Sequence, residues 1–98
     1  MVKDKEEILK KLKKLKDEIK RNYKVKSIGL FGSYINNKQK KASDIDFLVE
    51  FEDDADLFHS IGLSLFLEDQ FNKKVDVISK PTLKKELRER ILQEVIYV

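Results

Sequence analysis

Apolar residues recur at every third or fourth position over residues 4–22, and this spacing predicts an amphipathic helix. Asp4 is suited to the N-terminus of this helix, because its carboxylate can accept hydrogen bonds from the first free backbone amides. The opposite face is rich in lysine. The apolar face would consist of Ile8, Leu12, Leu15 and Ile19.

Three short segments have the composition of β-strands. Residues 25–31, 44–51 and 75–78 are rich in β-branched and aromatic side chains, and polar segments separate them. In a strand, successive side chains point to opposite faces, so Asp44 and Asp46 would share one face of the middle strand. Its other face would be buried and would carry Ile45, Phe47, Val49 and Phe51.

Two further helices are expected, one over residues 55–70 and one that begins near Pro81. In the first of these, we expect the core-facing side chains to be Leu57, Phe58, Ile61, Leu65 and Phe66. The remaining apolar positions, Leu63, Leu67 and Phe71, would then extend an apolar surface towards a partner. The apolar stripe of the last helix would consist of Leu83, Leu87, Ile91 and Val95.

This order of elements predicts an α+β fold. We expect a small, mixed, three-stranded sheet with the helices packed on one face and the acidic residues on the other. A chain of 98 residues is long enough for one hydrophobic core, so residues 1–98 are expected to form a single domain.

Composition narrows the functional classes. Hydrophobic residues make up 41% of the chain and charged residues 40%, and the net charge is +3. No apolar run approaches the roughly 20 residues of a membrane-spanning helix, and the charged N-terminus does not look like a signal peptide. The chain has no cysteine, which excludes thiolate metal sites and makes a cytoplasmic location the expectation.

Asp44 and Asp46 are the strongest indication of chemistry. Two carboxylates on one strand face repel each other and raise each other's pKa unless a cation lies between them. An all-oxygen site of this kind suits Mg²⁺ better than zinc. An EF-hand calcium loop is excluded, because Val49 and Ala55 stand where that loop requires glycine and glutamate.

Gly32 and Ser33 follow the first strand. Glycine permits a tight turn and a close approach of the backbone, while Ser33 offers a hydroxyl and an amide at the start of a short helix. Such a turn can hold a phosphate group, although a plain helix cap is the alternative role for Ser33. One end of the segment 31–51 could therefore bind a phosphate and the other end the metal of that phosphate.

Gly32-Ser33, a spacer of ten residues and Asp44-x-Asp46 before an apolar strand resemble the nucleotidyltransferase superfamily of the DNA polymerase β type. Within it, the short chain is similar to the minimal nucleotidyltransferases (MNT), the antitoxin halves of HEPN–MNT toxin–antitoxin pairs. Asp76 matches the third acidic residue of the family, and the ending 87–98 is also similar. The resemblance implies a polymerase β-like fold.

The resemblance also implies a reaction. Asp44, Asp46 and Asp76 would be catalytic and would hold Mg²⁺, while Gly32, Ser33, Asp44 and Asp46 would bind the nucleotide. AMP would pass from ATP to a hydroxyl group, expected to be a tyrosine, of a cognate HEPN ribonuclease toxin. This would neutralise the toxin, and the two proteins could form a hetero-oligomer. Simple surface solvation is the alternative for the three aspartates, but aspartate is disfavoured in strands.

The chain departs from the family directly after Gly-Ser. Many members carry basic residues there, whereas this chain has Tyr34, Ile35, Asn36 and Asn37. We hypothesise that positive charge for the triphosphate comes instead from Lys38, Lys40 or Lys41.

Two other classes of function remain open. A non-catalytic module could neutralise a toxin by binding and masking it. A nucleic-acid-binding protein could use the lysine-rich first helix, and its affinity would fall steeply with salt. A solvated helix face explains those lysines more simply, so nucleic acid is not the expected partner. His59 lies among apolar residues and is assigned no role in a site.

Overall fold

The structure is a computed structural model that describes residues 4–36, 40, 44–82 and 85–98. The elements in chain order are α1 (Lys5–Tyr23), β1 (Val25–Phe31), η1 (Gly32–Tyr34), β2 (Ile45–Phe51), α2 (Leu57–Phe71), β3 (Val75–Ser79), η2 (Lys80–Thr82), α3 (Lys85–Glu94) and β4 (Ile96–Tyr97). The expected order of helices and strands is confirmed up to α3, and Asp4 caps α1 through a hydrogen bond from the Glu7 amide. None of the described helices is long and apolar enough to cross a membrane.

The sheet is mixed, as expected, but it has four strands rather than three. The strand order is β3-β2-β1-β4; β2 pairs with β3 in parallel, and β1 pairs with β2 and with β4 antiparallel. The last helix ends at Glu94, and the chain then pairs with the edge of β1. Gly29 makes this possible, because a Cβ at that position would lie 2.7 Å from Val95 Cγ2 and 2.9 Å from the Ile96 carbonyl oxygen.

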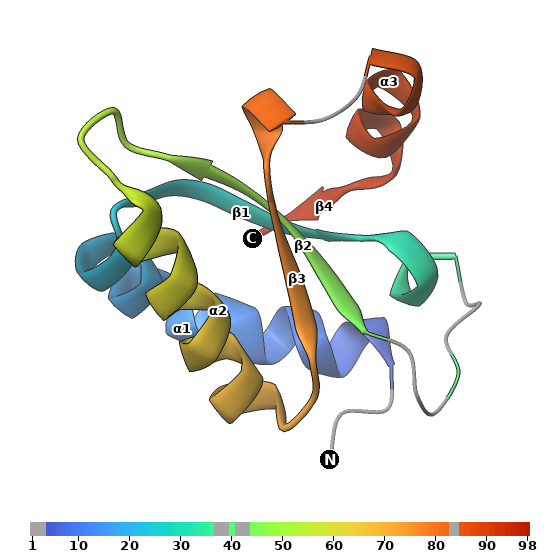
Figure 1. Ribbon diagram of the computed structural model, residues 1–98. Coiled ribbons are helices and arrows are strands. Elements are labelled where there is room, and N and C mark those ends of the chain that lie inside the picture. Colours follow the sequence, from blue (N-terminus) through green and yellow to red (C-terminus); the bar gives the residue numbers. More distant parts are fainter. Residues whose placement is uncertain (1–3, 37–39, 41–43, 83–84) are drawn as a thin grey trace.

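The main core lies between the sheet and the helices α1 and α2, which cover one face of it (Figure 1). The alternation expected for β2 is confirmed, since Ile45, Phe47 and Val49 are buried in this core, while Phe51 is half-buried against it. The ring of Phe47 packs against that of Phe71 on α2, with 5.7 Å between the ring centroids. This burial fixes the face of β2 on which Asp46 must lie.

The expected orientation of α2 is wrong. Its buried side chains are Leu63, Leu67 and Phe71, whereas its exposed apolar side chains are Leu57, Phe58, Ile61 and Leu65. Phe66 is half-buried against Tyr23, with 5.4 Å between the ring centroids. The physical reason is that α2 is apolar on both sides, so periodicity alone could not select the buried one. His59 has a structural role, because it completes a capping box with Asp56 at the start of α2.

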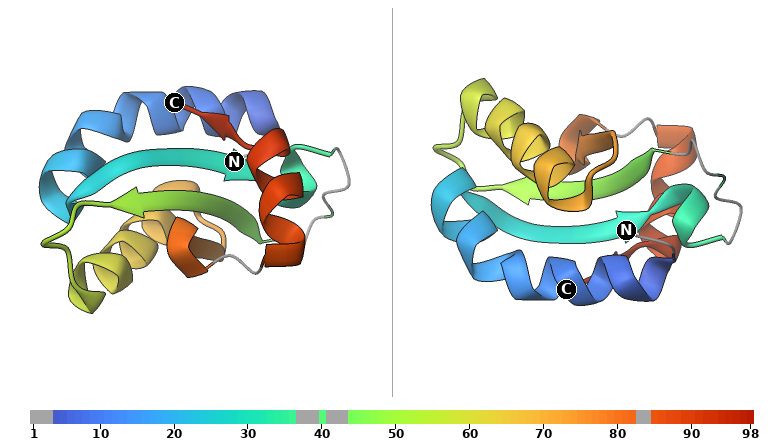
Figure 2. Two further views of the ribbon diagram at one scale, coloured as in Figure 1. Left: turned by 90° about the horizontal axis from the view of Figure 1, so that it is seen from above. Right: turned by 90° about the horizontal axis from the view of Figure 1, so that it is seen from below.

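The third helix, α3, lies on the opposite face of the sheet from α1 and α2 (Figures 1 and 2). We expected all helices on one face, so this part of the prediction is wrong. The second face of the sheet carries apolar side chains as well as aspartates, since Phe31 and Leu48 are both buried. An apolar sheet face requires a cover, and α3 lies over one end of it. The acidic face therefore has a helix beside it.

Candidate functional site

Asp46 and Asp76 lie side by side on neighbouring strands. They are register partners in the parallel pair of β2 and β3, so their side chains point to the same face of the sheet. Asp44 lies one residue before β2 and is exposed. Of the three aspartates that the sequence singled out, Asp46 and Asp76 are therefore adjacent, and Asp44 lies just before the start of β2.

The carboxylate of Asp46 is in a strained electrostatic environment. Burial is the largest of the causes that together raise the pKa of Asp46 from 3.8 to about 6, and the neighbouring carboxylates of Asp76 and Asp44 contribute the rest. This is the effect expected when acidic groups share a site without a cation between them. A bound cation would relieve both the burial cost and the repulsion.

Gly32 brings the end of β1 against this carboxylate. Its φ angle is +82°, in the left-handed region that favours glycine, and a Cβ at this position would overlap Asp46 Oδ2. The amides of Ile35 and Asn36 donate to the Gly32 carbonyl oxygen at 3.0 and 3.3 Å and close the turn. Ser33 follows in η1 and is half-buried. The short helix expected after Gly-Ser is therefore present and adjoins Asp46.

The oxygen donors of this site suit Mg²⁺. Within the described residues, no group of three or more His, Cys, Asp or Glu side chains forms a ready metal site. Mg²⁺ is usually held by one or two carboxylates together with substrate phosphates, rather than by a cage built from protein alone. Asp46 and Asp76, with Asp44 beside them, provide such a partial donor set.

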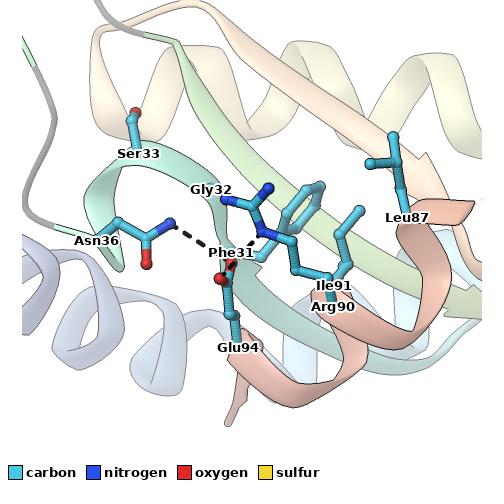
Figure 3. Close-up of a pocket in the computed structure, with 8 residues that line it drawn as sticks. All are labelled: Phe31, Gly32, Ser33, Asn36, Leu87, Arg90, Ile91 and Glu94. Carbon is cyan, nitrogen blue, oxygen red and sulfur yellow. Dashed lines mark hydrogen bonds and ion pairs between the residues drawn. The ribbon is translucent and has the colours of Figure 1, made fainter.

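A cleft of about 310 Å³ adjoins the site, between η1 and α3. It is lined by Phe31, Gly32, Ser33, Asn36, Leu87, Arg90, Ile91 and Glu94 (Figure 3). Within the cleft, Asn36 Nδ2 donates to Glu94 Oε2 at 3.4 Å, and Arg90 Nε contacts Glu94 Oε1 at 3.4 Å. Gly32 and Ser33 were expected at the site from the sequence. The residues of α3 were not, because their place in the cleft depends on the position of that helix.

The lysine hypothesis concerns the loop after η1. Lys38 and Lys41 lie outside the described residues, and Lys40 is exposed. The hypothesis therefore stays a prediction.

The sequence pattern of the nucleotidyltransferase domain family matches residues 12–98. A Methanocaldococcus jannaschii protein, named as a putative protein adenylyltransferase, is 48% identical over 77 residues, which is 79% of this chain and 90% of the relative. The protein adenylyltransferase MntA of Thermococcus cleftensis is 39% identical over 83 residues, 85% of this chain and 84% of the relative. The family match includes the whole segment from Gly32 to Asp76.

Solved structures have the same fold. One described as a putative minimal nucleotidyltransferase superposes with a TM-score of 0.79 at 30% identity, and the match covers 92% of both chains. A toxin–antitoxin complex of MntA and HepT contains a chain that matches with a TM-score of 0.59 at 25% identity, over 90% of this chain and 65% of that one. The resemblance inferred from Gly-Ser and the aspartates is confirmed. On sequence, fold and the arrangement of Asp46 beside Gly32, this chain belongs to the nucleotidyltransferase domain family.

Proposed function

We propose that this chain is an antitoxin that transfers AMP from ATP, with Mg²⁺, to a hydroxyl group of a cognate HEPN ribonuclease toxin. The acceptor is a tyrosine, and the transfer neutralises the toxin. The observation that carries the proposal is the pair of Asp46 and Asp76 in register beside the Gly32 turn. The similarity to the protein adenylyltransferase MntA supports a protein acceptor, and the similarity to the MntA–HepT complex supports a toxin partner.

The residues of the site would bind the metal and the phosphates and accept the proton of the acceptor. Asp44, Asp46 and Asp76 would hold Mg²⁺, which when bound neutralises phosphate charge and favours the deprotonated acceptor hydroxyl. Gly32 leaves room for the phosphates to approach the backbone of η1, and Ser33 offers them its hydroxyl and amide. Asp76 is exposed and lies beside Asp46, so it is positioned to receive the proton of the acceptor hydroxyl.

The chemical balance of the step is simple. A bond forms between the acceptor oxygen and the α-phosphorus of ATP, and the bond from that phosphorus to the bridging oxygen breaks. Pyrophosphate leaves with the electron pair of the broken bond. The proton of the acceptor hydroxyl passes to the carboxylate of Asp76. Catalysis of this type depends on positioning and charge neutralisation more than on a reactive side chain.

The test is intact-mass spectrometry of the cognate toxin after incubation with this chain, ATP and Mg²⁺. We expect the toxin to gain mass in whole AMP units, and the gain to disappear with Asp44→Asn. The matched control is Asp53→Asn, which removes a carboxylate from an exposed turn outside the site and should leave the gain unchanged. A toxin of unchanged mass in the presence of the unmodified antitoxin would contradict the proposal.

Neutralisation by binding alone is a second candidate. The observation that favours it is the exposed apolar side of α2, since contiguous apolar surface of this kind is typical of protein contacts. The same variant separates the two candidates. Under the masking hypothesis, Asp44→Asn still protects cells from the toxin; under the enzymatic one, protection is lost.

We further propose that residues 1–98 act as one domain and that the reaction takes place in the cytoplasm. The family match over residues 12–98 supports the first point. The use of ATP as a substrate supports the second.

A further inference from the structure

The three residues directly after Gly32 and Ser33 bring no positive charge to the proposed phosphate site. Tyr34 is buried, and Ile35 and Asn36 are neutral. A nucleoside triphosphate adds several negative charges next to the carboxylates of Asp46 and Asp76. Mg²⁺ held by the aspartates would offset part of this repulsion, but the terminal phosphates still carry most of the negative charge of the nucleotide. A cation in the cleft that Gly32 lines would offset the charge of these phosphates.

Arg90 provides a cation in this position. Among the described residues that line the cleft between η1 and α3, it is the only positively charged one. In Figure 3 its guanidinium group extends from α3 across the cleft towards η1. Because Gly32 lines the cleft and also contacts the Asp46 carboxylate, a nucleotide held at Asp46 can continue directly into the cleft.

The contacts of Arg90 leave it available to a ligand. Its Nε lies 3.4 Å from Glu94 Oε1, which is long for a charge-assisted hydrogen bond, and its side chain is 67% exposed. Glu94 Oε2 meanwhile accepts from Asn36 at 3.4 Å. Glu94 thus holds Arg90 loosely beside η1, and its negative charge would compete with an incoming phosphate for the guanidinium.

We propose that Arg90 binds the terminal phosphates of the nucleotide in this cleft, in place of the basic residues that the chain lacks after Gly-Ser. The planar guanidinium of arginine matches the geometry of a phosphate group, and the volume of the cleft, about 310 Å³, is at the small end of ligand sites. The inference rests on the proposed function, because it assumes that the site binds a nucleoside triphosphate.

The test measures binding directly, by calorimetry with AMP-PNP and with AMP, each in the presence of Mg²⁺. Loss of hydrogen bonds to a charged group should weaken AMP-PNP binding by about 10- to 100-fold in Arg90→Ala. Binding of AMP should change little, because AMP has no terminal phosphates. The matched control is Arg88→Ala on the same helix, which removes an exposed arginine that does not line the cleft and should leave both affinities unchanged.

A second variant tests whether Glu94 competes with the phosphates for Arg90. Glu94→Gln removes the competing charge but retains a hydrogen-bonding side chain, so AMP-PNP binding should become tighter. Besides Lys38, Lys40 and Lys41, Lys73 is a rival cation, since its Nζ lies 6.0 Å from the centroid of the Tyr34 ring in η1. A loss of AMP-PNP affinity in Lys73→Ala but not in Arg90→Ala would overturn the proposal.

The remaining outcomes are equally distinct. Equal losses of affinity for AMP and AMP-PNP in Arg90→Ala would mean that the cleft holds the nucleoside, and would overturn the proposal. A wild-type chain that binds no AMP-PNP would overturn it as well. The proposed function can fail separately. A wild-type chain that binds AMP-PNP through Arg90 but does not change the mass of the toxin would support the phosphate site and contradict the transferase role.

Discussion

The unfavourable environment of the ionised Asp46 carboxylate should lower the free energy of unfolding by a measurable amount. In the metal-free protein the folded state raises the pKa of Asp46 from 3.8 to about 6, mainly through burial and then through Asp76 and Asp44. The folded state therefore binds the proton more tightly than the unfolded chain. Below about pH 3.8 the group is protonated in both states and has no effect. As the pH rises towards 6 the folded state loses stability, and above pH 6 the full penalty applies.

Asp46→Asn removes this penalty, because the amide does not ionise. A difference of about two pH units, at about 1.4 kcal/mol each, sets a ceiling of about 3 kcal/mol on the gain in unfolding free energy. The side chain of Asp46 is only half-buried, so solvent screening should reduce the gain to about 1–2 kcal/mol. For a domain of this size, each kcal/mol corresponds to a rise of about 4–8 °C in Tm.

The assay is thermal unfolding followed by circular dichroism, in a buffer with a chelator, at pH 7.5 and at pH 3.5. We expect Asp46→Asn to have the higher Tm at pH 7.5 and the two proteins to converge at pH 3.5. Added Mg²⁺ with AMP-PNP should raise the Tm of the wild type more than that of the variant. Asp53→Asn, in an exposed turn, controls for the general loss of a negative charge. A variant that is no more stable than the wild type at pH 7.5 would refute the reasoning.

Two further predictions concern packing. Gly32→Ala should lower the unfolding free energy by roughly 1–3 kcal/mol, because alanine is strained at a φ of +82° and its Cβ would overlap Asp46; chemical denaturation measures this, and a stability within error of the wild type would contradict it. Leu67→Ala should cost about 2–5 kcal/mol because Leu67 is fully buried, whereas Leu65→Ala, on the exposed side of the same helix, should cost less than about 1 kcal/mol. Equal losses in the same denaturation assay would contradict the observed orientation of α2.

The sequence determined the features that depend on local order along the chain. The alternation in β2 fixed which side is buried and hence where Asp46 lies, because side chains in a strand alternate with a period of two. Gly32 and Ser33 marked the turn after β1, because the backbone conformation at Gly32 depends on the residue itself. With the spacing to Asp44 and Asp76, these features were sufficient to identify the family.

The tertiary structure decided what depends on distant contacts. The buried side of α2 could not be read from a helix that is apolar on both sides. Packing of Leu63, Leu67 and Phe71 into the core selected it. The position of β4 depends on the space that Gly29 leaves for the chain about 67 residues later, a contact that no local pattern encodes. Arg90 and Gly32 line the same cleft because the fold brings them together, and the sequence spacing between them does not predict this.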